Sequence, residues 1–548
     1  MKNNNPYLNV LIVLFLLIVI NLLSNSYFKR FDLTHDKRYT LSEETLNQVD
    51  RIEDDLIIKV YLQGKFPAEF KRIQLETNQF LEELRTINEQ IQFRFIDPLS
   101  NSKELIEKGL QPSRLTVQEG GTVSEAMIFP WAVINYKGKE EKVSLLVDAQ
   151  AVSQEHQLQQ SIENLEYAFA SAIHKITTEK NKKIAILKGN GQPDDIYLYS
   201  FLKNVGEYYR LAEFTLDSVE TNPERALSGL NDYDLALVVK PTLSFTEKEK
   251  LALDQYIMNG GKTIWLLDQI QAETDSLMVD GKSLAVNRSL NLTDMLFSYG
   301  VRINYNVTKD LYSSTLRLAA GNTGNQIQYE DFLWPYYPLV FASNRHAISK
   351  NTDPIILKYP SSIDTLSNHI KKTVLIESSP LAKIIGTPTA IALDEIATQP
   401  DKNSYTNSQT MFGVLLEGEF TSAYQSRILP FNLSTYKNKS SANKMLIVSD
   451  GDIALNEVLR GEPMELSKDK WTQQRYGNSD FLLNSVHYLI DDSGLINLRS
   501  KSLQIQFLDK EKVYEKRSVW QLINILLPMF LLLSFGWLYN FYRKKRFG

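Results

Sequence analysis

The longest apolar runs of the chain lie near its two ends. No charged side chain stands between Lys2 and Lys29, or between Arg517 and Arg543. A helix rises about 1.5 Å per residue, so about 20 residues cross the hydrocarbon core of a bilayer, and both stretches are long enough to do so. The pattern therefore predicts one membrane helix over 7–28 and another over 518–542. For the first stretch, a cleaved signal peptide ending near residues 24–26 is the alternative.

Basic residues set the predicted orientation. The cluster at 543–546 directly follows the second apolar stretch, and basic residues beside a membrane helix favour the cytoplasmic side. The N-terminal end has a weaker and opposite bias, from Lys29 and Arg30. We let the C-terminal cluster decide and expect both ends in the cytoplasm. The body would then be periplasmic in a Gram-negative cell, held at the inner (cytoplasmic) membrane.

The first part of the body alternates strand and helix patterns, which predicts a thioredoxin-like α/β domain over 40–178. The expected elements are strands at 56–62 and 91–96 with a helix over 70–87 between them, strands at 125–136 and 141–148 joined by a turn at 137–139, and a helix over 159–177. With 0 Cys in the chain, such a domain would be redox-inactive, because the chemistry of the fold requires a cysteine pair.

A second α/β domain is expected over 182–495, because strand and helix patterns alternate again and predict a doubly wound parallel sheet. The expected elements are strands at 184–187, 212–216, 234–239, 263–267 and 445–448, and helices over 197–209, 246–258 and 481–490. Thr246 and Glu249 form a capping-box pattern at the start of the middle helix. The Ser- and Asn-rich stretch 270–440 has weak periodicity and is predicted to form large insertions and edge strands.

Composition narrows the classes of function. The chain has 548 residues, with 60 Lys plus Arg against 65 Asp plus Glu, for a net charge of −5. This balance lacks the basic footprint of a nucleic-acid-binding protein, so no nucleic-acid partner is expected. The absence of Cys excludes disulfides, thiol nucleophiles and thiolate zinc sites.

Candidate site residues follow the predicted strands. Asp268 follows the strand at 263–267, Asp450 and Asp452 follow the strand at 445–448, and Gly189 and Gly191 follow the strand at 184–187. Open α/β sheets bind ligands at the carboxyl ends of their strands, so these five residues form the candidate ligand or partner site. The carboxylates could hold a cation or position a general base, and a solvated turn capped by Asp is the alternative. For the two glycines, a phosphate-binding turn and a tight structural turn are both open.

Catalytic motifs are missing from the sequence. Residues 259–263 resemble the end of a Walker A loop, but its first Gly would fall on Tyr256 and Lys262 enters a strand. No H-E-x-x-H or G-x-S-x-G motif is present, and His174 and His487 are expected to be packing or surface residues. We expect no catalytic residue, metal or cofactor. The aromatic run Trp334–Pro338 is predicted to be an interaction surface or a loop of the insertion that covers the core.

Eight short segments carry a family resemblance that covers nearly the whole chain. They are Arg30–Thr34, Lys37–Ser42, Gly64–Pro67, Phe95–Pro98, Ile162–Tyr167, Lys183–Leu187, Asn259–Lys262 and Gly477–Asn484. With the two apolar ends, they resemble the gliding-motility-associated ABC-transporter auxiliary proteins, the G component of that system. The resemblance implies a membrane-anchored extracytoplasmic subunit that works with a multi-span ABC permease and a cytoplasmic ABC ATPase in surface gliding of Bacteroidetes-type bacteria.

The same resemblance implies a flavodoxin- or amidotransferase-like second domain, shared with an intraflagellar transport protein, and it supplies no catalytic residues. We therefore expect a non-enzymatic, substrate-binding-like subunit that binds a solute or a protein partner. The first alternative is a structural scaffold that couples a membrane complex to surface motility or secretion machinery. The second is a membrane-tethered hydrolase that uses Asp450 and Asp452. Assembly into a homodimer is left open.

Overall fold

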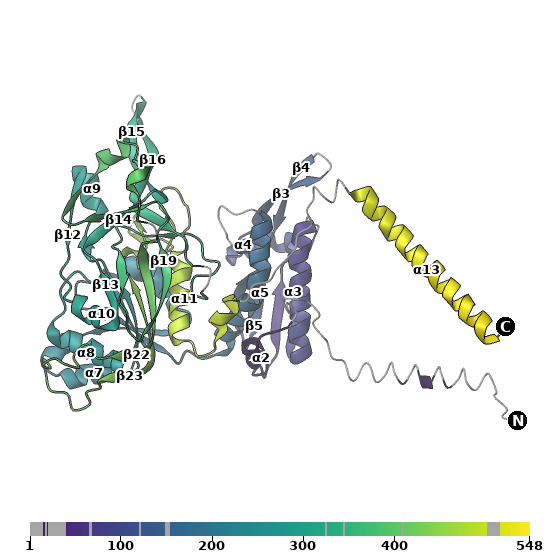
Figure 1. Cartoon of the computed structure of the whole chain (residues 1–548), viewed down its shortest axis with the longest axis horizontal. Helices are drawn as coiled ribbons and strands as arrows, with labels where there is room; N and C mark the ends of the chain where they lie inside the picture. Colours follow the sequence, from purple (N-terminus) through teal and green to yellow (C-terminus); the bar gives the residue numbers. More distant parts are fainter. Residues whose placement is uncertain are drawn as a thin grey trace. The chain divides into compact units, whose positions relative to one another are not determined.

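The computed structural model describes residues 40–64, 68–119, 122–147, 154–323, 326–343, 346–407, 409–500 and 516–547, and four single N-terminal positions. By its contacts the chain divides into two units, Met1–Ser502 and Leu503–Gly548. The predicted first membrane helix, 7–28, lies outside the described residues except for Ile12, Phe15, Leu16 and Val19, which are helical. Figure 1 labels the main elements.

A small mixed sheet forms the first part of the larger unit. Its region comprises α2 (Glu43–Val49), β1 (Leu56–Val60), α3 (Ala68–Ile87), β2 (Ile91–Phe95), α4 (Ser102–Glu107), β3 (Ser113–Glu119), β4 (Thr122–Ile128), β5 (Trp131–Tyr136), β6 (Lys139–Ser144) and α5 (Gln154–Thr177). The strand order is β2-β1-β5-β6, with β1 parallel to β2 and antiparallel to β5. Helices α3 and α5 lie side by side, and the rings of Phe80 and Phe169 pack 5.4 Å apart between them (Figure 1).

The predicted strand at 125–136 is wrong in one respect, because the structure divides it into two strands. β4 ends at Ile128 and β5 begins at Trp131, with Pro130 between them. Proline has no backbone N–H and cannot continue a ladder of hydrogen bonds, so the break falls there. β4 then pairs with β3, which the hydrophobic pattern did not indicate.

A nine-stranded sheet forms the second part of the larger unit. Its parallel strands and their helices are β7 (Lys183–Lys188), α6 (Asp195–Gly206), β8 (Arg210–Thr215), α7 (Pro223–Leu230), β9 (Leu235–Val239), α8 (Glu247–Met258), β10 (Lys262–Leu266), β23 (Lys439–Val448) and α11 (Asn478–Ile490). The order is β13-β18-β22-β23-β10-β9-β7-β8, with β19 also paired to β22. β8, β7, β9, β10 and β23 run parallel to one another.

Helices cover both faces of this sheet because successive strand residues point to opposite sides. Val238 and Trp265 belong to a buried cluster that includes residues of α7, α8 and α10. Leu237 and Leu266 belong to a second cluster, with residues of α6 and α11. The capping box of α8 is confirmed: the Glu249 N–H donates to Thr246 Oγ1 over 3.2 Å, and the Thr246 N–H donates to Glu249 Oε2 over 2.7 Å.

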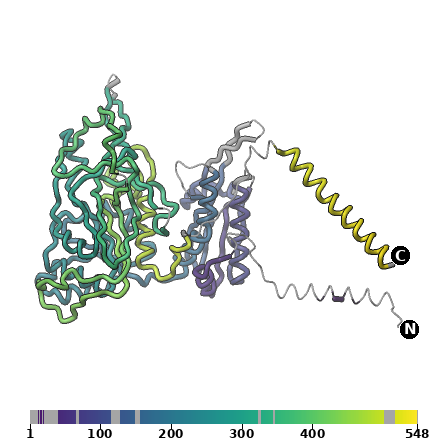
Figure 2. The backbone as a smooth tube through the Cα atoms, viewed as in Figure 1, coloured from purple at the N-terminus to yellow at the C-terminus, as the bar shows by residue number. Residues whose placement is uncertain are grey.

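The Ser- and Asn-rich stretch contains more regular structure than its weak periodicity indicated. It forms β11 (Ile270–Gln271), α9 (Thr274–Asp280), β12 (Lys282–Asn287), α10 (Thr293–Tyr299), β13 (Val301–Ile303), β14 (Asn306–Asp310), β15 (Ser313–Thr323), β16 (Gln326–Val340), β17 (Ile355–Ile356), β18 (Ile363–Thr365), β19 (Lys371–Glu377), β20 (Ala382–Gly386), β21 (Thr389–Ala392) and β22 (Met411–Thr421). β13, β18, β19 and β22 extend the large sheet with antiparallel pairings. Figure 2 shows this teal-to-green segment beside the parallel strands.

The aromatic run 334–338 lies in the interior. Trp334, Tyr336 and Tyr337 of β16 are buried and pack with Tyr359 and Val307 in a separate cluster. The predicted loop is wrong, because the run belongs to the strand β16, and the burial of its three aromatic rings argues against an exposed interaction surface.

The smaller unit contains α13 (Arg517–Phe547), the yellow helix of Figure 1. An 18-residue window within Arg517–Arg546 has a mean hydropathy of 1.9, and among the described residues this is the one helix long and apolar enough to cross a membrane. The predicted span 518–542 lies within it. Residues 543–546, which supply the basic cluster, continue the same helix.

Candidate functional site

Three of the predicted site residues meet at the carboxyl ends of neighbouring strands. β10 and β23 are parallel, with Leu266 paired to Val448, so the residues that follow them emerge at the same edge of the sheet. As a result Asp268, Asp450 and Asp452 place carboxylate oxygens within 4.8 Å of one another. We call these residues the aspartate cluster.

The aspartate cluster holds the ammonium group of Lys240. This lysine follows β9, and its Nζ lies 2.6 Å from Asp452 Oδ2 and 3.3 Å from Asp268 Oδ2. Burial lowers the pKa of Lys240, but the two carboxylates outweigh it and the net shift is upward. A Cβ at Gly451 would lie 2.6 Å from the Lys240 Cβ, so the glycine lets the two loops approach closely. The chain thus supplies its own cation.

Asp450 lies beneath this ion pair and makes backbone hydrogen bonds. Its Oδ2 accepts from the Lys358 N–H over 2.6 Å, and its Oδ1 accepts from the Asp452 N–H over 2.7 Å. Burial, with the nearby charge of Asp452, raises the pKa of Asp450 well above its usual range. Through these two hydrogen bonds the carboxyl group holds the turn after β23 in place.

The two predicted glycines occupy a tightly packed turn after β7. Both have positive φ, +105° at Gly189 and +70° at Gly191. A Cβ at Gly189 would meet the Asp217 carboxylate, and one at Gly191 would overlap Thr242 Oγ1. The carbonyl of Asn190 accepts the backbone N–H groups of Thr242 and Leu243. The structure thus gives these glycines close neighbours on both sides, and the loop after β9 fills the turn.

A cleft of about 200 Å³ adjoins the aspartate cluster. Asp452, Lys358, Tyr337 and Trp471 contribute to its lining. The Lys358 ammonium lies 5.6 Å from the centre of the Tyr337 ring, a distance suited to a cation–π contact. This cleft is the concave surface that a solute-binding role at the strand ends requires, and its lysine and aromatic rings would suit a small polar ligand.

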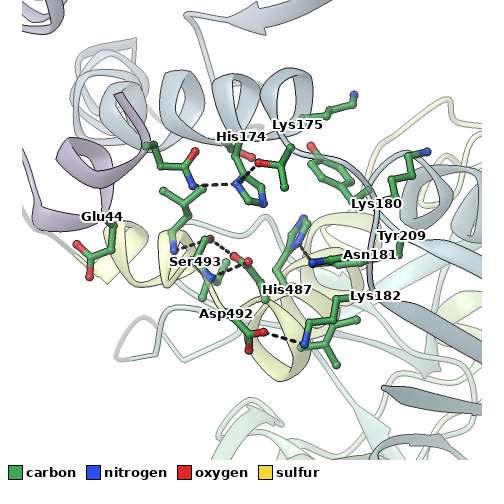
Figure 3. Close-up of a pocket in the computed structure, with 18 of the residues that line it drawn as sticks. Glu44, His174, Lys175, Lys180, Asn181, Lys182, Tyr209, His487, Asp492 and Ser493 are labelled. Carbon is green, nitrogen blue, oxygen red and sulfur yellow. Dashed lines mark hydrogen bonds and ion pairs between the residues drawn. The ribbon is translucent and has the colours of Figure 1, made fainter. Parts of the chain in front are cut away.

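A larger pocket, with a volume of about 420 Å³, contains two histidines and is not a site that the sequence predicted. Its lining comes from α2, α5, the connector 178–182, residues 207–209, the end of α11 and residues 491–496. We call it the histidine pocket. In Figure 3 the side chains of His174, on α5, and His487, on α11, extend into the space between their two helices.

Each histidine is hydrogen-bonded at Nδ1. The Gln48 amide lies 2.8 Å from His174 Nδ1, and the Tyr209 hydroxyl lies 2.7 Å from His487 Nδ1. Burial lowers the pKa of both rings, that of His487 to about 4, and it raises the pKa of Tyr209. Both imidazoles are therefore neutral at physiological pH. Neither histidine belongs to a catalytic or metal-binding motif, so the sequence did not indicate that the two side chains would lie in one pocket.

Ion pairs surround this pocket. Lys175 Nζ lies 2.8 Å from Glu141 Oε1 and 2.7 Å from Glu207 Oε2. Lys182 Nζ lies 2.7 Å from Asp492 Oδ2, and Lys180 Nζ donates to the Gly206 carbonyl. The lysines at the wall of the pocket are thus already engaged by the protein.

Fold and sites together define an α/β protein with one helix suited to a membrane. A family model described as an ABC-type uncharacterized transport system, an auxiliary component, matches residues 181–485, more than half of the chain. The chain therefore belongs to this family of ABC transport-system auxiliary proteins. Membership implies an accessory role in an ABC transport system and association with an ABC transporter complex, as the sequence predicted.

Other comparisons add little to this assignment. A second family model, for a domain of unknown function, matches residues 35–135. No curated protein matches the chain. Among solved structures, the N-terminal domain of mmIFT52 has 12% identity and a TM-score of 0.32, covering 57% of this chain and 98% of its own. A putative ThuA-like protein from Parabacteroides merdae has 10% identity and a TM-score of 0.26, covering 60% and 94%.

Proposed function

We propose that this protein is a non-enzymatic, membrane-anchored subunit of an ABC transporter complex that serves gliding motility. The family match over 181–485 is the observation that carries the proposal. Since the sequence has no Walker A loop, ATP hydrolysis falls to a separate cytoplasmic ATPase, and transport falls to a multi-span permease. The link to gliding rests on the motif resemblance.

We also propose that the body of the protein consists of two domains. The first domain, 40–178, is thioredoxin-like, which the strand order β2-β1-β5-β6 and the helices α3 and α5 support. The second, 182–495, is a doubly wound domain of flavodoxin or amidotransferase type, which the parallel strands and the helices on both faces support.

The proposed location is the inner membrane, with the body in the periplasm. Helix α13 is long enough to anchor the chain, and its last turn carries Lys544, Lys545 and Arg546, which favour a cytoplasmic C-terminus. A second anchor over 7–28 would return the N-terminus to the same side.

A binding role, rather than catalysis, suits the strand-end site. Lys240 forms ion pairs with the carboxylates of Asp268 and Asp452, and Asp450 is hydrogen-bonded to backbone N–H groups. A general base must reach a proton of the substrate, and these groups are already occupied. The neighbouring cleft offers the ammonium of Lys358 and the ring of Tyr337 to a solute.

The scaffold role is the second candidate, and one surface favours it. The hairpin of β15 and β16 exposes Ile327, Tyr329 and Leu333 to solvent. These residues alternate along β16 and so share one face of the hairpin, as an apolar contact for a protein partner would require.

Purification of the native complex tests the proposal. The tagged full chain is extracted from its own membranes in mild detergent, and co-purifying proteins are identified by mass spectrometry. We expect a multi-span permease and a Walker-motif ATPase in a stable ratio. An untagged strain and an unrelated tagged membrane protein serve as controls. Recovery of envelope or motility proteins alone would contradict the transporter role and favour the scaffold.

A further inference from the structure

The histidine pocket has the dimensions of a small-molecule site. Its volume of about 420 Å³ lies within the range of about 300–1,000 Å³ that such sites occupy. It is lined by residues of the larger unit alone, so a ligand there would need only the body of the protein.

The hydrogen bonds at the two rings determine which groups remain for a ligand. The Gln48 amide N–H donates to His174 Nδ1, so the His174 proton lies on Nε2. The Tyr209 hydroxyl lies 2.7 Å from His487 Nδ1 and can donate to this nitrogen or accept from it. His174 therefore offers an N–H donor at Nε2, and His487 also has its Nε2 atom left for a ligand. The protonated Nε2 of His174 has no lone pair for a metal ion, which disfavours a metal as the ligand.

Asp491 supplies a hydrogen-bond acceptor beside the two rings. It lines the same pocket, and its charge acts on both His174 and His487. Its carboxylate accepts the backbone N–H of Ser493 over 2.9 Å and also the Ser493 hydroxyl, which leaves other lone pairs available. Charges of both signs line the pocket: the Asp491 carboxylate would repel a negative ligand, and the Arg51 guanidinium would repel a positive one.

One part of the remaining lining is aromatic and apolar, and the rest is polar or charged. Tyr208 lies edge-on to His487, with ring centres 4.6 Å apart, and Ile490 and Leu495 also line the pocket. Tyrosine combines a large apolar face with a polar hydroxyl, so such a wall packs against C–H groups and also forms hydrogen bonds. Lys175 and Lys182 are engaged in the ion pairs described above, and Lys180 donates to a backbone carbonyl, so these lysines offer a charged ligand little.

We propose that the histidine pocket binds an uncharged, polyhydroxylated ligand of mono- or disaccharide size. A hydroxyl group both donates and accepts, so it matches the N–H of His174, the Nε2 of His487 in either tautomer and the Asp491 carboxylate together. The C–H faces of a sugar ring match the tyrosine and the apolar wall. This site is separate in its lining from the strand-end cleft, and its ligand does not depend on the transporter partners.

Titration calorimetry of the detergent-purified full chain tests the proposal. The probes are glucose, galactose, mannose, N-acetylglucosamine, maltose and cellobiose, with glucuronate as the charged counterpart. We expect at least one neutral sugar to bind with a Kd of about 1 mM or tighter, and glucuronate to bind at least about tenfold more weakly than glucose. No heat of binding from any neutral sugar at about 10 mM, or tighter binding of glucuronate, would overturn the proposal.

Substitutions in the histidine pocket test whether the sugar binds there. Tyr209→Phe removes the hydroxyl at His487 Nδ1, and Gln48→Met combined with Thr178→Val removes the amide and the hydroxyl that both contact His174 Nδ1. Each should weaken sugar binding about tenfold, the effect of losing about one hydrogen bond. Gln48 is only half-buried, so the second variant remains informative if Tyr209→Phe does not fold. The control, Tyr329→Phe on the exposed hairpin, should bind as the wild type does. Unchanged binding in both pocket variants would overturn the proposal, and co-purification of the permease and ATPase would be unaffected by either result.

Discussion

The ammonium of Lys240 lies 2.6 Å from the carboxylate of Asp452, at the edge of the sheet where the parallel strands end. It occupies the position that a bound cation would take among Asp268, Asp450 and Asp452. A lysine in this position offsets one negative charge of the cluster without a ligand, so the cleft beside the aspartates is the better candidate for ligand binding.

Loss of Lys240 should destabilise the protein strongly. Lys240→Met leaves the charges of Asp268 and Asp452 without a partner in a poorly solvated site, so we expect the free energy of unfolding to fall by about 3–5 kcal/mol. Urea denaturation measures the change. The control is Lys248→Met, which breaks the more exposed ion pair to Glu220 and should cost no more than about 1 kcal/mol. Equal effects of the two substitutions would contradict a structural role for Lys240.

The same variant should gain affinity for divalent cations. Without the ammonium, the aspartate cluster presents carboxylate oxygens, the ligands that Ca²⁺ prefers. We expect Ca²⁺ to raise the melting temperature of Lys240→Met and to leave that of the wild type unchanged. A rise in the wild type of the same size would mean that the native cluster binds metal despite its lysine.

Asp450→Asn distinguishes a structural turn from a catalytic carboxylate. One oxygen acceptor becomes a donor facing a backbone N–H, so stability should fall by about 1–3 kcal/mol. Function, measured as restored surface spreading in a deletion strain, should persist at growth temperature. Asp280→Asn, an exposed substitution, is the control. Loss of spreading with normal folding and normal assembly of the complex would revive the hydrolase hypothesis.

His487 should make stability depend on pH. Burial lowers its pKa from 6.5 to about 4, so between these values the unfolded chain binds the proton and the folded chain does not. Stability contributed by the neutral ring is complete above pH 6.5 and declines as the pH falls, by about 3 kcal/mol at pH 4. Denaturation of the wild type and of His487→Gln at several pH values gives the difference. The variant should have a flatter profile, and His369→Gln, at an exposed site, should keep the wild-type slope.

Alanine substitutions at two glycines with similar φ angles distinguish the cost of backbone strain from the cost of steric overlap. Gly191→Ala puts a methyl group into Thr242 Oγ1 and against Leu243, so it should cost at least about 2 kcal/mol. Gly138, in the β5–β6 turn, has φ of +78° and no neighbouring atom within 4 Å of an added Cβ. Gly138→Ala should cost only the backbone strain of about 1 kcal/mol. Chemical denaturation of both variants compares them, and an equal cost would mean that the turn after β7 is more open than the structure shows.

Reporter fusions test the orientation of α13. Because Lys544, Lys545 and Arg546 end the helix, we expect a fluorescent protein fused after residue 548 to be active and alkaline phosphatase fused there to be inactive. Fusions after residue 500, before the helix, should give the opposite result. The same result at both positions would show that α13 does not cross the membrane in this protein.

The sequence by itself determined the features that depend on neighbours along the chain. The period of apolar residues predicted α13, most strands of both sheets and the helices between them, and the capping box at Thr246 and Glu249 predicted the start of α8. These signals are local, because a helix or strand shows its buried face within a few residues. The break at Pro130 could have been predicted in the same way, from the missing N–H.

Only the tertiary structure decided which side chains meet. Strand order places β9, β10 and β23 side by side, although the whole stretch from β11 to β22 separates the last two in sequence. That order brings Lys240 to Asp452, and the approach of α5 to α11 brings His174 toward His487. No local period encodes such pairings, because they depend on how distant surfaces pack and on which charges that packing removes from water.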